Sequence, residues 1–497
     1  MWRVGGFLYI SELFEKRERS IYQLFLLLRT HDGIVSIKEA CHVLDISKST
    51  LLRYIETFCE EASSDKIGLQ IRLHNEELHL QRDANLSRQE LLSYLCQSSL
   101  KFQILLYLFE KNEFSIPSLS QELLISEATL NRQLSSLNKL LKGFEISIRS
   151  GKLKGSELQI RYFYFQLFWL TFPVASLEQD RVFKEQLRYL PIFERFYHSK
   201  LNPRQSHQMA LWLMIVYKRM RLKDLDFQAC YRLIAPYKDH KFYRNLRNLF
   251  LTLSQQFSAS FQEGDTMSVF AFLFSQGILE AHQLEQLLGF GGPIMEATTW
   301  GFKQLKLSLK TELPVEESEL YHLNQVFSHL YFFTCSLESE LGDIDVYDKR
   351  LQLAARNIVE TVYRDIYGRK NAICLDSHCL SLLELFSYLM QVEPTIVQVG
   401  LASSYPAIVT YPILHMLQQE LESNRSIVIE PLQENKVYDF IICHDYLLEG
   451  ETVYQLYGRP SSHDLQQLKQ IISHLRKEKI EQAKRLVERS YFLIERR

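Results

Sequence analysis

Two sets of polar and basic side chains lie 79 positions apart in the chain, and a serine, a threonine and an arginine recur at matching positions. Hydroxyls and amides hydrogen-bond to phosphate oxygens and base edges, and Lys and Arg neutralise phosphate charge. Similar residue types at matching positions in both sets therefore predict two contacts with double-stranded DNA. The first set consists of Ser47, Lys48, Thr50 and Arg53, and the second consists of Ser126, Thr129, Asn131, Arg132 and Lys139.

Helices that would position these side chains precede and contain each set. Three are expected in the first copy, over Ile21–Arg29, Ser36–Leu44 and Lys48–Cys59. Three more are expected in the second copy, over Ser99–Lys111, Ser115–Leu124 and Ser126–Leu141. Serine is a preferred residue at helix N-termini, as at Ser36 and Ser47. Because apolar positions also match between the copies, the pattern predicts two helix-turn-helix units in register.

Each third helix is followed by a segment typical of a β-hairpin. In the first copy, alternating apolar and polar residues over Leu69–Leu73 and Glu77–Gln81 flank an expected turn at His74-Asn75. In the second copy, Glu145–Arg149 and Lys152–Lys154 flank Ser150-Gly151. Both units are therefore predicted to be winged. This adds three basic residues to the expected DNA contacts, namely Arg149, Lys152 and Lys154.

Positive charge is concentrated in the second copy. Residues 127–161 contain seven basic and three acidic side chains, a net charge of +4 in a chain whose net charge is −2. The first copy has Glu56, Glu60 and Glu61 beside its basic residues. We therefore expect the second unit to supply more of the phosphate contact. Two alternatives stay open, because a charged outer helix face is often only solvated and a winged helix can serve protein contacts alone.

The overall composition is that of a globular protein with several domains. Of the 497 residues, 46% are hydrophobic and 23% are charged, while Gly and Pro are scarce, which favours long helices. The eight cysteines form no C-x-x-C pair, so we expect buried thiols in a reducing cytoplasm and no metal site. The uncharged stretches Tyr162–Leu177 and Pro394–Gln419 are interpreted as buried segments rather than membrane spans.

The segment after the second hairpin resembles a known family. Residues 153–163 (LKGSELQIRYF) are similar to the G-x-E-x-x-I-R-Y-F junction of the Mga/AtxA/RofA-like regulators, which are stand-alone virulence regulators of Gram-positive bacteria. Residues 206–219 and 321–331 resemble the family more loosely. The resemblance implies two winged helices, two helical domains related to phosphotransferase-system regulation domains (PRD), and a C-terminal domain like enzyme IIB.

Helical patterns fill the middle of the chain, and the usual enzyme signatures are absent from the sequence. Helices are expected over Gln208–Arg221, Phe242–Phe257, Met267–Leu288, Glu316–Leu341 and Tyr347–Tyr367. The family resemblance implies that sugar-transport phosphotransferases phosphorylate histidines in this region. The candidates are His207, His322 and His329. A hydrogen-bonded packing role for each histidine is the alternative.

Alternating β and α patterns begin after Pro394 and predict a small parallel α/β domain. Its expected first loop, Gly400–Tyr405, has no cysteine, so no phosphocysteine chemistry is expected there. The resemblance compares this domain with enzyme IIB and implies a dimerisation role. Strands are expected over Thr395–Val399, Ser426–Glu430, Val437–Cys443 and Thr452–Tyr457, and helices over Ala407–Leu421 and Asp464–Ser490.

Together these patterns predict a mainly α, multidomain protein without enzymatic activity. The expected domains are residues 1–85 and 86–161 (winged helix-turn-helix), 162–300 and 301–392 (PRD-like), and 393–497 (α/β, like enzyme IIB). We expect a cytoplasmic homodimeric regulator that binds promoter DNA and activates virulence or surface-protein genes, without cofactor, metal or membrane. RNA polymerase and phosphotransferase-system proteins are further candidate partners. The alternatives are an RNA-binding antiterminator, disfavoured by the helical N-terminus, and a phosphotransferase-system sugar-operon activator, disfavoured by the missing cysteine.

Overall fold

The computed structural model describes residues 8–31, 33–64, 67–82, 87–256, 262–279, 291–309, 317–338, 344, 347, 349–368, 375–390, 397–421, 427–433, 436, 438–444 and 453–475. The chain forms two compact units: Met1–Gly301 with Glu316–Gly342 and Val359–His378, and Phe302–Val315 with Asp343–Ile358 and Cys379–Arg497. Within the described ranges, no helix is long and apolar enough to cross a membrane. The ends of several expected elements, among them 280–288, 339–341 and 476–490, lie outside the described residues.

The first repeat (residues 16–82) has three helices and a hairpin. It consists of α1 (Lys16–Thr30), α2 (Ile37–Leu44), α3 (Lys48–Ser64), β3 (Leu69–His74) and β4 (Glu77–Arg82). A short strand that was not expected, β2 (Ile34–Ser36), pairs with β4 and completes a sheet of order β2-β4-β3. The hairpin turn lies at Asn75-Glu76, one residue later than expected, because His74 pairs with Glu77 and the two residues between them have positive φ.

The second repeat (residues 100–154) has the same order of helices and hairpin. It consists of α5 (Leu100–Lys111), α6 (Ile116–Glu122), α7 (Glu127–Leu141), the 3-10 turn η2 (Lys142–Phe144), β5 (Ser147–Arg149) and β6 (Lys152–Lys154). The helix expected to reach Leu124 ends at Glu122, because Leu124 has a φ of +53°. An additional helix, α4 (Arg88–Gln97), precedes the repeat and begins with a capping box between Ser87 and Glu90.

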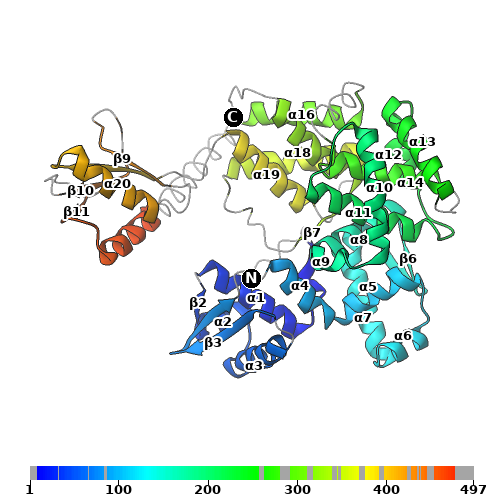
Figure 1. The fold of residues 1–497 in the computed structure, drawn as a ribbon, viewed down its shortest axis with the longest axis horizontal. Helices are drawn as coiled ribbons and strands as arrows, with labels where there is room; N and C mark the ends of the chain where they lie inside the picture. The colour runs from blue at the N-terminus through cyan, green and yellow to red at the C-terminus, as the bar shows by residue number, and fades with distance from the viewer. Residues whose placement is uncertain are drawn as a thin grey trace, which may run out of the picture. The chain divides into compact units, whose positions relative to one another are not determined.

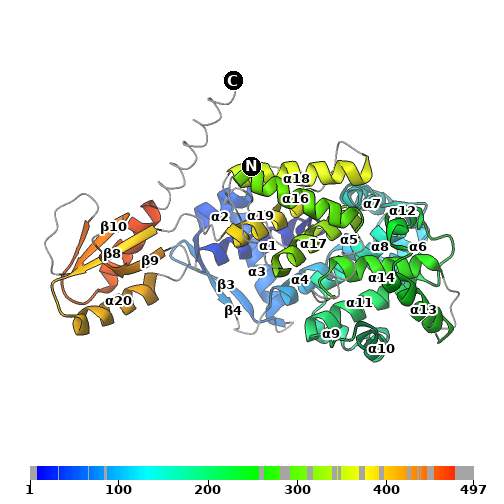
Figure 2. The same cartoon turned by 90° about the horizontal axis from the view of Figure 1, so that it is seen from above.

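Beyond the second repeat the first unit is almost entirely helical (Figure 1). Its central element is α8 (Glu157–Thr171), which is buried on all sides and lies against α4 and α11 (Figure 2). An apolar helix that packs on every face is typical of a core helix. The other helices of the first unit are α9 (Val174–Leu177), α10 (Arg181–Tyr197), α11 (Pro203–Arg219), α12 (Gln228–Ile234), α13 (Lys241–Gln256), α14 (Glu263–Ser275) and α17 (Glu317–Phe332). Three more helices, α16 (Pro293–Leu309), α18 (Lys349–Tyr367) and α19 (Asp376–Met390), are each divided between the two units.

One expected helix is shorter in the structure, and two expected domain boundaries fall inside helices. The helix expected over Glu316–Leu341 ends at Phe332, because β7 (Leu337–Glu338) is extended and pairs in parallel with β1 (Leu8–Tyr9). The domain boundaries expected after residues 161 and 300 fall inside α8 and α16.

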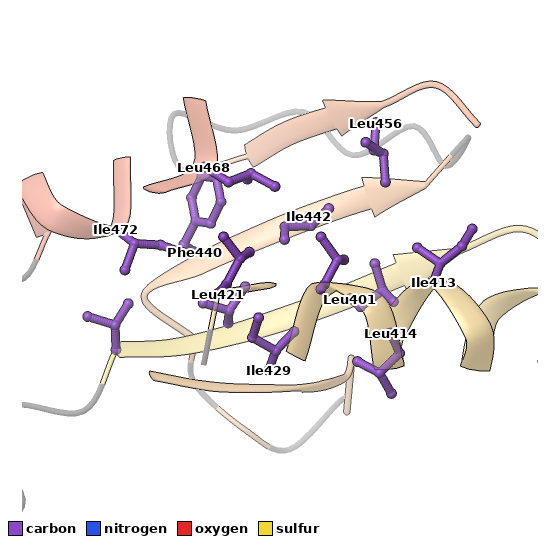
Figure 3. Close-up of a cluster of buried hydrophobic side chains, with 13 residues drawn as sticks. Leu401, Ile413, Leu414, Leu421, Ile429, Phe440, Ile442, Leu456, Leu468 and Ile472 are labelled. Carbon is purple, nitrogen blue, oxygen red and sulfur yellow. The ribbon is translucent and has the colours of Figure 1, made fainter. Parts of the chain in front are cut away.

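In the second unit, residues 397–475 form a parallel sheet packed against helices. Its strands are β8 (Val397–Ser403), β9 (Ile427–Pro431), β10 (Phe440–His444) and β11 (Val453–Leu456), in the order β11-β10-β8-β9. The helices are α20 (Ala407–Leu421) and residues 462–475. Alternate strand residues such as Val399, Leu401 and Ile442 pack against Leu417 and Leu468 of these helices (Figure 3).

The structure also corrects the first loop of this domain. Residues Gly400–Ser403, expected in a loop, belong to β8 because they pair with β10 on one side and, at Gly400 and Leu401, with β9 on the other. Cys443 lies within β10 and is fully buried, as expected from its position near the end of that strand.

Candidate nucleic-acid interface

The outer face of α7 carries five of the side chains expected to contact DNA. Ser126 caps the helix, because its Oγ accepts a hydrogen bond from the backbone N of Thr129 at 3.1 Å and lies 3.0 Å from Oγ1 of Thr129. Asn131, Arg132 and Lys139 are exposed. The apolar residues of α7 face the core, so these polar groups point to solvent. The helix thus presents amide and guanidinium donors that could reach a groove of DNA.

The hairpin β5–β6 is fastened to α7 by one amide side chain. Asn138 Nδ2 donates to the carbonyl O of Ile148 at 3.0 Å, and Ile148 N donates to Asn138 Oδ1 at 2.6 Å. This two-way bond fixes the hairpin beside the helix. Arg149 and Lys154, the first and last cations of the hairpin, are exposed.

The tip of the hairpin is held against the segment before α6. Phe114 N donates to the carbonyl O of Gly151 at 3.0 Å, and a Cβ at Gly151 would lie 1.8 Å from Phe114 O. Only glycine therefore fits at this turn. Lys152 forms an ion pair with Glu113 across the same contact, and the hydrogen bond to Glu113 raises the pKa of Lys152. Of the three wing cations expected to contact DNA, Lys152 is thus engaged within the protein.

A groove of about 870 Å³ separates α7 from the hairpin. Its lining is partly polar and carries two cations, which is compatible with a sugar-phosphate backbone. The polar lining residues include Asn131, Ser135, Asn138, Lys139, Lys142 and Ser150.

In the first repeat the basic side chains expected to contact DNA have neighbours within the protein. Ser47 caps α3 by accepting from the N of Thr50 at 3.3 Å. Lys48 Nζ donates to both carboxylate oxygens of Glu76, at 2.7 and 2.8 Å. Arg53 is exposed, with its guanidinium 5.7 Å from the ring centroid of Tyr54. The residues expected at this surface are therefore present, but Lys48 would have to leave Glu76 to meet a phosphate.

Cys59 and Asn138 play equivalent roles in the two repeats, which the sequence alone did not indicate. Cys59 lies 79 positions before Asn138, and it holds the hairpin of the first repeat in the same way. Ile71 N donates to Cys59 Sγ at 3.4 Å, and Sγ donates to the carbonyl O of Ile71 at 3.7 Å. Cysteine and asparagine differ in side-chain chemistry, so only their matching position in the repeat could have revealed this role.

The junction that follows the second hairpin begins with a turn that requires glycine. Gly155 has a φ of +137°, and a Cβ there would lie 2.7 Å from the carbonyl O of Glu145. Glu157 N then donates to the carbonyl O of Asp226 at 2.7 Å, which ties the start of α8 to the segment before α12. Glycine at 155 therefore permits the close approach that starts α8.

Four charged side chains form a buried network around α8. Glu157 accepts from Arg161 Nε at 2.9 Å and from Arg219 Nε and Nη2 at 2.7 and 2.8 Å. Arg161 Nη2 also donates to Asp265 at 2.7 Å and Nη1 to Ser268 at 2.7 Å. Arg161, one of the seven basic residues counted in 127–161, is fully buried.

The pKa directions within this network differ between its two acids. Burial opposes ionisation of Glu157, but Arg219 and Arg161 outweigh it and lower the pKa of Glu157. For Asp265 burial outweighs the pairing with Arg161, so the pKa of Asp265 is raised. Burial likewise disfavours charge on Arg219, yet Glu157 raises the pKa of Arg219. Glu157 is therefore the anion that holds both guanidinium groups in place.

One of the expected histidines belongs to a hydrogen-bonded cluster next to this network. His329 on α17 bonds through Nε2 to the hydroxyl of Tyr162 and through Nδ1 to Nε2 of His378 at 2.8 Å. The ring of Tyr162 stacks on Phe333 with centroids 3.8 Å apart. Burial, and the neighbouring His378, lower the pKa of His329 well below its usual range. Both ring nitrogens of His329 are thus occupied by hydrogen bonds within the protein.

The other two expected histidines are more accessible. His207 Nε2 lies 3.0 Å from Glu178 Oε1, and its side chain is 19% exposed. Its ring is parallel to Phe183, with centroids 6.2 Å apart. His322, at the start of α17, is exposed. Although His322 and His329 are two turns apart on one helix, they differ in exposure because Tyr162 and His378 cover His329.

Comparison of the sequence with known proteins finds similarity to regulators. Residues 84–168 match the model of the Mga helix-turn-helix domain, a range that contains α4, the second repeat and most of α8. The chain is also 22% identical, over 322 residues, to the capsule synthesis positive regulator AcpB of Bacillus anthracis. That match covers 62% of this chain and 66% of AcpB, just under two thirds of its length. The resemblance to the Mga/AtxA/RofA-like regulators, expected from the junction motif, is therefore confirmed.

Proposed function

We propose that this protein is a DNA-binding transcription regulator whose second repeat makes the main DNA contact. The observation that carries the proposal is the set of free cations on α7 and its hairpin. Arg132, Lys139, Arg149 and Lys154 are exposed, and in the described part of the chain none of them forms a hydrogen bond or ion pair. Such cations can replace the counterions of phosphates without first breaking a bond within the protein.

Both repeats are proposed to be winged helix-turn-helix modules with unequal shares in binding. Arg161 and Glu157 are buried, yet six basic and two acidic residues remain in 127–161, so the net charge of +4 is unchanged. The first repeat keeps Lys48 paired with Glu76. This difference supports a supplementary role for the first repeat, such as a second backbone contact.

The proposal is tested by the salt dependence of DNA binding. We expect the affinity of the full chain for a labelled duplex from upstream of its own gene to fall with salt. Arg132→Ala with Lys139→Ala should reduce the slope of log K against log salt by about 2, because each phosphate contact contributes about 0.9. The matched pair Lys48→Ala with Arg53→Ala should reduce it by less than 1. Equal losses for the two pairs, or binding of hairpin RNA in preference to the duplex, would contradict the proposal.

We further propose that the C-terminal domain joins two copies of the chain. Support comes from large apolar side chains that are exposed at and beyond the carboxyl ends of the parallel strands. Ile408 is 84% exposed and Tyr457 is 82% exposed, and Tyr405, Val409 and Tyr411 are exposed too. Such a patch is unusual on a monomer. Sedimentation equilibrium at micromolar concentration should give a dimer, and Ile408→Asp with Tyr457→Asp a monomer; a monomeric wild-type protein would refute this.

Histidine phosphorylation is proposed at His322 and His207 rather than at His329. His322 is exposed and His207 is partly exposed, whereas both nitrogens of His329 are hydrogen-bonded. A phosphoryl group adds charge that could shift the packing of the helical region. Incubation with a phosphoenolpyruvate-driven phosphotransfer system should give acid-labile phosphate that is lost in His322→Ala with His207→Ala. Label that persists in this variant would contradict the assignment.

The genes under control are proposed to encode virulence or surface components, with activation as the mode. The support is the similarity to AcpB, a positive regulator of capsule synthesis. Such activation would involve RNA polymerase as a partner. Transcript profiling of a deletion strain should show lower expression of surface-component genes, whereas higher expression would indicate repression.

A further inference from the structure

We infer that a cavity at the base of the second repeat binds a small zwitterionic ligand, an amino acid or short peptide with free amino and carboxyl groups. The cavity has a volume of about 690 Å³ and lies wholly within the first unit. Pockets of roughly 300–1,000 Å³ are typical of small-molecule sites. Its walls come from the start of α8 and from α12, α16, α17 and α18.

Three charged side chains around the cavity have no partner of their own. Arg232 lies on α12, Glu296 on α16 and Asp365 on α18, and all three are exposed. In the part of the chain that the structure describes, none of them forms an ion pair or hydrogen bond, even with one another. Opposite charges left unpaired around one cavity suit a ligand that brings both charges. A ligand carboxylate would bond to Arg232, and an ammonium group to Glu296 and Asp365.

Part of the inner surface of the cavity is apolar and would take a ligand side chain. Leu158, Leu233, Tyr331 and Val362 are buried, and Trp300 is half-buried beside them. Such a surface favours a ligand with an apolar body, and the indole face of Trp300 can also attract an ammonium group. An inorganic anion would use Arg232 alone, and a metal ion would use only the carboxylates. A peptide-like ligand uses all of these features together.

One wall of the cavity is bonded to the second repeat. Gln159 of α8 donates to the carbonyl O of Phe332 at 2.8 Å and accepts from the N of Thr334 at 3.3 Å. Thr334 Oγ1 donates in turn to the carbonyl O of Gly143 at 3.4 Å. Gly143 lies in η2, which joins α7 to its hairpin. A bound ligand would thus stiffen the segment that holds α7 and the hairpin together.

The experiment is calorimetric titration of the full chain with two tripeptides that have no charged side chain, leucyl-alanyl-alanine and phenylalanyl-alanyl-alanine. Each is used in three forms: free, N-acetylated and C-amidated. We expect saturable binding of at least one free form, and a loss on the order of tenfold when either terminus is blocked, because each block removes one charge-assisted contact. Hydrogen exchange should slow at residues 156–159 when the ligand is bound.

Substitutions in the protein test recognition of the two ends of the ligand separately. Glu296→Gln with Asp365→Asn should abolish the preference for a free amino terminus, and Arg232→Gln the preference for a free carboxyl terminus. These residues are exposed, so the fold should survive, and hydrogen exchange of the ligand-free variants checks this. Absence of saturable binding by both free peptides up to about 10 mM, or equal binding of all three forms, would overturn the inference. DNA binding is not part of this readout, so its failure would leave the proposed regulator function standing.

Discussion

Replacing Glu157 by glutamine should weaken the first unit more than any other single conservative change in the buried charge network. Glu157 is 1% exposed and accepts three hydrogen bonds from two guanidinium groups, at 2.7, 2.8 and 2.9 Å. Glutamine keeps the shape but removes the negative charge, and its amide group would face a donor of Arg219. The variant therefore buries two cations with only Asp265 to balance them.

The size of the effect follows from this geometry. Breaking a buried ion pair by removing one partner costs about 3–5 kcal/mol. Asp265→Asn is the matched comparison, because Asp265 accepts one bond from Arg161 and its Oδ2 has no partner in the described structure. Its raised pKa shows that burial already disfavours its charge. We therefore expect Asp265→Asn to cost about 1–3 kcal/mol, less than Glu157→Gln.

Native-state hydrogen exchange of the α8 amides is the suitable assay, because a chain with two units does not unfold in one step. Glu157→Gln should speed exchange of these amides by roughly a hundred- to several-thousand-fold, since each factor of ten corresponds to about 1.4 kcal/mol. Urea unfolding followed by tryptophan fluorescence, to which Trp212, fully buried on α11, contributes, gives an independent measure. A cost of Glu157→Gln below about 1 kcal/mol, or a larger cost for Asp265→Asn, would refute the reasoning.

The pH dependence supplies a further check on the same variant. The pKa of Glu157 is lower in the folded protein than its ordinary value of about 4.3. Its ionisation therefore adds stability that is fully present above that ordinary value and is lost as the pH falls through the lower folded value. The difference between the wild type and Glu157→Gln should accordingly be constant near neutral pH and shrink below about pH 4. A gap that widens on acidification would contradict this assignment.

Three other changes test the geometry around the second repeat. Gly155→Ala should destabilise the junction by about 2–3 kcal/mol, because its φ of +137° and the nearby Glu145 carbonyl exclude a Cβ; thermal unfolding measures this, and an unchanged midpoint would count against it. Asn138→Ala should free the hairpin and speed amide exchange at Ile148 on the order of tenfold or more, since two hydrogen bonds are lost; equal protection in variant and wild type would show that the clamp is dispensable. Leu124→Asn should raise stability by about 1 kcal/mol, because leucine is strained at a φ of +53° and the side chain is 91% exposed; a lower melting temperature would argue that Leu124 makes a contact of its own.

Local features of the repeats could be predicted because neighbouring residues determine them. Ser36 and Ser47 cap their helices as expected, since the hydrogen bond that each serine oxygen accepts from the amide three residues later needs no distant partner. The capping box of Ser87 and Glu90 was an equally local signal, and attention to it would have revealed α4. By contrast, the strand Ile34–Ser36 has three residues and forms only by pairing with β4, more than 40 positions away.

Long-range partners limited the prediction of the site itself. Lys152 was a sound candidate for phosphate contact by residue type, but Glu113, 39 positions earlier, pairs with it once the hairpin folds back. In the same way, Gly400–Ser403 reads as a loop locally and becomes a strand because β9 and β10 lie on its two sides. In both places the decisive interaction joins segments whose proximity only the tertiary structure establishes.

The junction motif was recognised by its resemblance to a family, and its residues act in the structure as packing contacts. Its glycine, Gly155, permits the turn; Glu157 and Arg161 anchor α8 to α11 and α14; and Tyr162 bonds to His329 of α17. Phe163 packs edge-on against Phe144, directly after α7, with centroids 5.2 Å apart. The bonds of Glu157 and Arg161 are buried, and the bond between Tyr162 and His329 is partly buried. The motif therefore joins the second repeat rigidly to the helical region, so a change of packing among those helices would reach α7 and its hairpin through α8.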